Sequence, residues 1–176
     1  ESIALAGRLA ALFGDLQADA AERRGSGGEG VDNLLTGPDR FTGVFSVDVL
    51  ASDAVEKMKF WIGKGFSGMR LFTTGSTMPG QATWFDDPRS FPAWEYAGKA
   101  GMPVCMQMTP QGFPQLRGLL DRFKDVRVIL DHLARPKLTD GPPYAADKEF
   151  LDLAQSKNVF LKLTPLNVSP ADWGKA

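Results

Sequence analysis

The sequence has 176 residues, of which 43% are hydrophobic, so it is long enough for one domain with a substantial core. Its 20 basic and 21 acidic side chains are mixed along the chain and give a net charge of −1, which argues against nucleic acid as the main partner. The single cysteine, Cys105, excludes an internal disulfide and a zinc cluster built from cysteines.

The N-terminal part of the sequence predicts one helix and one linker. Leu5, Leu9 and Leu12 recur at helical spacing, which indicates an amphipathic helix through about Ala21. A glycine-rich stretch at residues 23–30 follows and is typical of a linker or an exposed loop. Its glycines lack the spacing and the preceding strand of a phosphate-binding loop, which argues against a nucleotide site here.

From Phe41 onward, apolar strand segments alternate with helical segments. We expect strands at about 41–48, 68–73, 103–108, 126–132 and 159–164, separated by helices at about 52–65, 92–101, 114–123 and 145–156. Ser52 is the expected N-cap of the first of these helices. A parallel strand can only follow another after such a crossover, so the pattern predicts an α/β fold with a parallel sheet. The length is short for a complete eight-unit barrel, which needs about 250 residues. The pattern alone does not decide between part of a barrel and an open doubly wound sheet, but the glycine fingerprint of a dinucleotide-binding sheet is absent.

Polar residues stand where these strands should end, and parallel folds place their sites at those carboxyl ends. Arg70 lies within the second predicted strand, Gln107 closes the third, and Lys162 with Thr164 closes the fifth. Arg70 is costly to bury without an anion, and either an internal ion pair or a substrate carboxylate would meet that need. Lys162 is a second candidate cation or a lysine that extends toward solvent. Gln107 could bond to a substrate hydroxyl or to a neighbouring strand end.

His132, the only histidine, closes the fourth predicted strand. It shares strand parity with Val128 and Leu130, so it would lie at the mouth of a barrel if those two face the interior. A neutral imidazole there could bind a metal or donate to a carbonyl oxygen, while the alternative is a cap on a nearby backbone group. Asp131 would then point to the opposite side and organise the following loop.

A long polar segment, residues 72–89, follows the second predicted strand, and segments of this length are uncommon unless functional or disordered. Met78, Trp84 and Phe85 could form a lid over a small ligand. Asp86 and Asp87 precede a proline and are more typical of turn and capping residues than of a catalytic pair.

Residues 38–41, 65–71, 128–136 and 158–164 resemble, in that order, the amidohydrolase-related family. The most specific segment is Asp131-His132-Leu133 followed by Arg135-Pro136. The branch that it resembles contains 2-pyrone-4,6-dicarboxylate lactonase and sugar-lactone hydrolases such as L-fuconolactonase. The resemblance implies a partial TIM-type (β/α)₈ barrel that holds strands two to six of eight. Residues 1–37 would then belong to the first unit, and residues 38–176 would be the central units of a single barrel domain truncated at both ends.

The resemblance also implies a function and a set of site residues. It predicts a hydrolase that opens a lactone or similar cyclic ester of a small acidic or sugar-derived substrate, with His132 catalytic and Arg70 binding the substrate. The strand-end positions add Gln107 and Lys162 as further substrate-binding candidates. Two alternatives stay open: a metal-dependent decarboxylase of the same superfamily, and a non-catalytic barrel fragment or binding protein.

The family's metal centre is expected only in a longer protein. The family pairs two histidines on its first strand and an aspartate after its eighth, and neither feature has a counterpart among these residues. A divalent metal such as zinc, with His132 as one ligand, is therefore expected in the full-length protein or not at all, and residues 1–176 alone are expected to be inactive. We expect a small-molecule substrate as partner and neither nucleic acid nor membrane. The sequence leaves the oligomeric state open and gives a cytoplasmic location only by default.

Overall fold

A computed structural model describes residues 42–74, 80–137 and 139–164. The predicted helix at residues 5–21, the glycine-rich linker and the division at residue 37 lie outside the described residues and stay predictions. Within the described part, no helix is both long and apolar enough to cross a membrane.

Five parallel strands form one sheet in the order in which they occur along the chain. They are β1 (Val44–Phe45), β2 (Gly68–Phe72), β3 (Val104–Gln107), β4 (Val128–Leu130) and β5 (Val159–Leu161). A doubly wound sheet reverses its strand order at a switch point, and this sheet does not. The uninterrupted order is that of a barrel segment and confirms the predicted parallel α/β fold.

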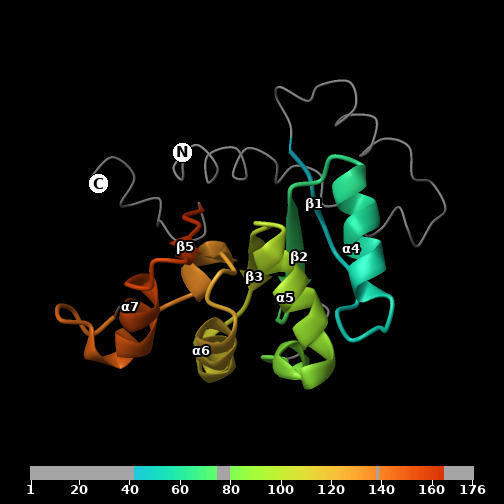
Figure 1. Ribbon diagram of the computed structural model, residues 1–176. Coiled ribbons are helices and arrows are strands. Elements are labelled where there is room, and N and C mark those ends of the chain that lie inside the picture. Colours follow the sequence, from blue (N-terminus) through green and yellow to red (C-terminus); the bar gives the residue numbers. More distant parts are fainter. Residues whose placement is uncertain (1–41, 75–79, 138, 165–176) are drawn as a thin grey trace.

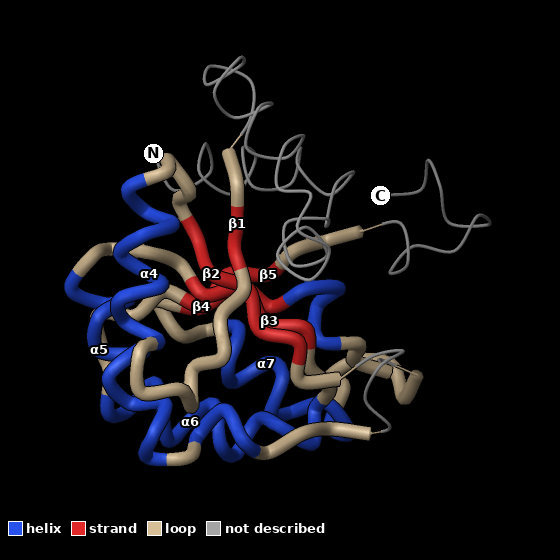
Figure 2. Tube along the Cα trace, turned by 90° about the vertical axis from the view of Figure 1, so that its right-hand side faces the viewer, coloured by secondary structure: helices blue, strands red, loops and turns tan. Residues whose placement is uncertain are grey.

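Among the described residues, one α-helix lies between each pair of successive strands, and Figure 2 shows the helices gathered around one side of the strands. They are α4 (Ala54–Gly63), α5 (Phe91–Lys99), α6 (Phe113–Arg122) and α7 (Lys148–Ala154), all visible in Figure 1. Pro92 and Pro114 lie in the first turns of α5 and α6, where the missing N–H costs nothing. The prediction of Ser52 as the N-cap of α4 is wrong, because Asp53 occupies that position and no side chain caps the helix.

The two faces of the sheet pack differently. Val128 and Leu130 join the main core together with buried helix residues such as Leu116 and Leu153. The opposite face, which we call the inner face, carries a small second cluster of Val44, Cys105, Ile129 and Phe160. The premise that Val128 and Leu130 face the barrel interior is therefore wrong, because both side chains face the helices.

Of the segment after β2, the described residues Trp84 and Phe85 pack against the core and do not form the expected lid. Phe85 is completely buried, and its carbonyl oxygen accepts hydrogen bonds from Trp94 Nε1 at 3.0 Å and Ser90 Oγ at 2.9 Å. Trp84 packs against the same core, and Met78 lies outside the described residues. The lid interpretation is thus wrong for Trp84 and Phe85.

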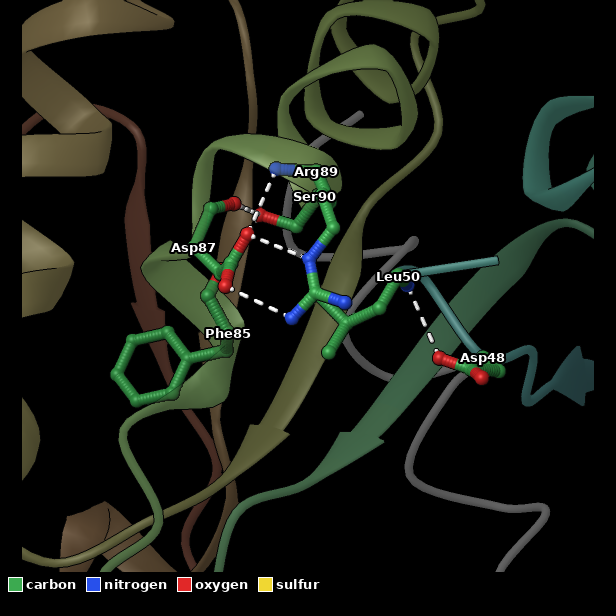
Figure 3. Close-up of polar contacts among 6 residues, drawn as sticks. All are labelled: Asp48, Leu50, Phe85, Asp87, Arg89 and Ser90. Atoms are coloured by element: carbon green, nitrogen blue, oxygen red, sulfur yellow. Dashed lines mark hydrogen bonds and ion pairs between the residues drawn. The ribbon is translucent and has the colours of Figure 1, made fainter. Parts of the chain in front are cut away.

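The turn after Phe85 is organised by Asp87, as its position before a proline predicted. Its carboxylate accepts from the backbone N–H and the side chain of Arg89, at 2.9 to 3.0 Å (Figure 3). These hydrogen bonds lower the pKa of Asp87 to about 2. Asp48 makes a similar local bond, accepting from the Leu50 N–H at 2.9 Å in the same view. Both carboxylates therefore shape backbone turns.

Candidate active site

Four polar side chains meet on the inner face where the strands end, and we call them the charged cluster: Arg70, Gln107, Asp131 and Lys162. Arg70 Nη2 donates to Gln107 Oε1 at 3.1 Å and lies 2.9 Å from Asp131 Oδ2. Lys162 Nζ lies 3.3 Å from Asp131 Oδ1. The structure thus brings together the three predicted substrate-binding residues, which come from β2, β3 and the end of β5.

The sheet register explains why these side chains share one face. Arg70 pairs with Cys105, Cys105 with Ile129, and Ile129 with Phe160, so these residues form one row across the sheet. Side chains alternate between faces along a strand, so residues two positions further on return to the inner face. Gln107, Asp131 and Lys162 occupy those positions, one step closer to the carboxyl ends.

Asp131 is the residue that sequence reasoning misplaced. It was expected to point away and organise a loop, but its side chain is 0% exposed and lies between the two cations. A signal was available: Asp131 is the only acidic residue in the four predicted strands from residue 68 to residue 164. Arg70 and Lys162 require an anion when buried, and among the predicted strands from residue 68 to residue 164 only Asp131 could supply it.

Burial changes the pKa values of titratable side chains in and beside the charged cluster. Burial lowers the pKa of Arg70 and of Lys162, and the charge of Asp131 opposes the change in both. Burial raises the pKa of Cys105 to about 12, and Asp131 adds to this effect. The Arg70 guanidinium also lies 4.4 Å from the centre of the Phe72 ring, a cation–π contact.

The sequence left two alternatives for Arg70, an internal ion pair and a contact with a substrate carboxylate. Its side chain is only 4% exposed and makes the internal ion pair. The side chain of Lys162 is more exposed, at 11%. Direct contacts of Arg70, Gln107 and Lys162 with a substrate stay predictions.

His132 lies in an unusual backbone segment immediately after β4. Residues 132–135 all have φ between 53° and 57°, in the left-handed region, although none is glycine. Such a conformation costs roughly 1–2 kcal/mol per residue. A hydrogen bond from Arg135 N to His132 O closes the turn at 3.0 Å, and Ala134 is completely buried. Left-handed segments of this kind persist when their surroundings hold them, and they cluster at functional sites.

The His132 imidazole lies beside the end of β5. Its Nδ1 is 2.7 Å from Thr164 Oγ1, a hydrogen bond between two side chains. Partial burial is the largest cause of a lowered pKa for His132; Asp131 opposes it, whereas Lys162 and other nearby cations add to it. The neutral imidazole is therefore favoured, which suits a hydrogen-bonding or metal-binding role.

The described residues do not by themselves provide a metal site. No group of three or more histidine, cysteine, aspartate or glutamate side chains within them could hold an ion. Both carboxylate oxygens of Asp131, the acidic neighbour of His132, already face Arg70 and Lys162. A metal centre would need ligands from outside the described residues.

Comparisons with known proteins agree with this architecture. Residues 4–174 match the amidohydrolase family. L-fucono-1,5-lactonase of Burkholderia ambifaria is 30% identical over 83 residues, which are 47% of this chain and 29% of that protein. The chain therefore spans less than a third of this curated relative.

Solved structures show the same fold at low identity. A probable 2-pyrone-4,6-dicarboxylic acid hydrolase of Acinetobacter baumannii is 21% identical, with a TM-score of 0.59 over 78% of this chain and 52% of that one. An amidohydrolase of Burkholderia multivorans with bound zinc has 18% identity and a TM-score of 0.58 over 76% and 47%. A dihydroxybenzoic acid decarboxylase of Polaromonas with bound manganese has 15% identity and a TM-score of 0.54 over 90% and 61%.

These likenesses confirm the partial barrel, and two of the solved structures contain a bound divalent metal. Which of the eight barrel strands the five strands represent stays a prediction. The family match extends over nearly the whole sequence, and the chain belongs to the amidohydrolase family.

Proposed function

We propose that the protein is a hydrolase that opens a lactone or similar cyclic ester of a small acidic or sugar-derived substrate. The observation that carries the proposal is the 30% identity to L-fucono-1,5-lactonase. The fold likeness to a probable 2-pyrone-4,6-dicarboxylic acid hydrolase supports it, because that name also describes the hydrolysis of a cyclic ester.

The charged cluster and His132 suit the chemistry of ring opening. Water adds to the carbonyl carbon of the lactone, the bond from that carbon to the ring oxygen breaks, and the ring oxygen takes up a proton. Negative charge develops on the carbonyl oxygen during the addition, so hydrogen-bond donors or cations near that oxygen lower the barrier. We assign polarisation of the carbonyl to His132.

In the same proposal, Lys162 and Gln107 orient the polar or acidic groups of the substrate, and Arg70 holds the ends of β2, β3 and β4 in register through its contacts. A lysine at a strand end suits a substrate with a carboxylate. We assign the activation of water to a carboxylate outside the described residues.

The test uses the full-length protein and a panel of lactones. L-fucono-1,5-lactone, other sugar lactones and 2-pyrone-4,6-dicarboxylate each release one proton on ring opening near neutral pH, which an indicator assay follows. We expect His132→Asn to lower kcat by about 10²-fold or more, since oxyanion donors commonly contribute that much. The circular dichroism spectrum should stay unchanged.

Lys99→Gln is the matched control, because Lys99 is an exposed helix residue paired only with its neighbour Glu95 among the contacts seen. It should keep the parent kcat. A His132→Asn variant with an unchanged kcat would contradict the role of His132, and no turnover of any lactone would contradict the proposed function.

A second candidate is a metal-dependent decarboxylase. It is favoured by the fold likeness to the manganese-bound dihydroxybenzoic acid decarboxylase. Release of CO₂ from a dihydroxybenzoate, without ring opening of any lactone, would replace the first proposal with this one. The metal content of the full-length protein should be measured in the same preparations.

A further inference from the structure

The pairing of β4 with β5 changes by one residue at His132. Val128 N donates to Asn158 O at 2.9 Å, and Lys162 N donates to Leu130 O at 3.0 Å, as in a regular parallel ladder. The next donor in a regular ladder would be His132 N. Instead, Leu133 N donates to Lys162 O at 3.2 Å. His132 is therefore the extra residue of a bulge.

The bulge accounts for the direction of the His132 side chain. Asp131 faces inward, so in a continued strand His132 would face the helices, as Leu130 does. The extra residue and its left-handed backbone instead bring the imidazole to Thr164, two residues beyond Lys162. Bulges that redirect a side chain in this way are over-represented beside active sites.

We propose that Thr164 is a positioning residue for His132: its hydroxyl holds Nδ1, so that Nε2 is the nitrogen the imidazole presents to the substrate. The presentation to substrate rests on the hydrolase function proposed above. The hydrogen bond itself, at 2.7 Å, is seen in the structure and does not depend on that function.

The hydroxyl acts on the ring in two ways. It restricts rotation of the imidazole plane, because a short bond to Nδ1 tolerates little misalignment. It also biases which nitrogen carries the proton, since the partner of one ring nitrogen sets the state of the other. A partner that orients a histidine in this manner typically changes activity by 10–100-fold when it is removed.

The test compares Thr164→Val with Thr164→Ser in the full-length protein. Valine keeps the shape of threonine and lacks the hydroxyl, whereas serine keeps the hydroxyl. We expect Thr164→Val to lower kcat by about 10-fold or more, with KM changed much less, and Thr164→Ser to restore most of kcat. Equal kcat in all three proteins, or a serine variant as slow as the valine variant, would overturn the proposal.

A second readout observes the ring directly. Nitrogen-15 NMR at one fixed pH reports how the proton is divided between the two nitrogens, and the His132→Asn variant assigns the signal. We expect Thr164→Val to shift this division and Thr164→Ser to leave it near the parent value. Thr164→Ala serves in place of valine if the valine variant does not fold.

The two proposals fail in different ways. An unchanged nitrogen pattern in Thr164→Val overturns the positioning role, whatever the protein hydrolyses. The absence of lactone turnover in the unaltered protein overturns the proposed function and leaves the nitrogen result standing.

Discussion

Replacing Asp131 with asparagine should destabilise the protein far more than removing any surface carboxylate. Asparagine keeps the shape of the side chain but removes the charge that faces Arg70 at 2.9 Å and Lys162 at 3.3 Å. Asp131 is 0% exposed and Arg70 is 4% exposed, so water cannot replace the lost anion. Breaking a buried ion pair by removing one partner costs roughly 3–5 kcal/mol. The asparagine oxygen still accepts a hydrogen bond, which places the expected loss near the lower end, at about 3 kcal/mol.

Urea unfolding of the full-length protein, followed by circular dichroism, measures this loss. Glu95→Gln is the matched control, because Glu95 forms an exposed ion pair with Lys99 within one helix and such pairs contribute little. A double-mutant cycle then divides the loss between the cations. We expect stronger coupling of Asp131 to Arg70 than to Lys162, whose side chain is more exposed and further away. An Asp131→Asn variant no less stable than Glu95→Gln would refute the reasoning.

Two further predictions concern buried groups. Trp94→Phe and Ser90→Ala should each lose at least about 1 kcal/mol in urea unfolding, because each removes a hydrogen bond to the Phe85 carbonyl and Trp94→Phe also shrinks a buried side chain. The double variant should lose more than the sum, because the buried Phe85 carbonyl then keeps neither donor; strict additivity would contradict this. The Cys105 thiol should resist thiol reagents at pH 8 in the native protein and react at once in denaturant. Because its pKa is raised in the fold from 9.0 to about 12, its contribution to stability is complete below pH 9 and lost as pH rises toward 12, a loss that Cys105→Ala should not show.

The fold was predictable because its signals are local. Continuous apolar strands, helical spacing between them, and prolines at Pro92 and Pro114 each report one element without knowledge of the others. The predicted strands overlap all five observed ones, although the observed strands are shorter. The helix at residues 145–156 begins in the structure with a short 3₁₀ turn at Ala145–Asp147 and continues as α7.

The arrangement of the site was only partly predictable. The strand-end rule selected Arg70, Gln107, Lys162 and His132, and the structure brings the first three together. The inner face was assigned wrongly because a strand buried on both sides is apolar at every position, as in Val128-Ile129-Leu130, so alternation carries no information about direction. Only the polar side chains indicate which face of the sheet is the inner face.

The bulge at His132 left no signature in the sequence. Glycine is the usual marker of a left-handed backbone, and the four residues 132–135 contain none. Tertiary contacts hold that conformation, including the hydrogen bond from Leu133 to the β5 backbone. Thr164 was visible as a strand-end residue, but its partner depends on that bulge.

The ion pairs of Asp131 restrict how this protein can be recombined with its relatives. Barrels of repeated strand–helix units invite the exchange of single units between homologues. Here Arg70 comes from the β2 unit, while Asp131 and Lys162 come from the ends of β4 and β5. A chimera that takes β2 from one parent and the later strands from another must inherit a compatible set of three charges. The unit of exchange in this half of the barrel is therefore the whole span from β2 to β5.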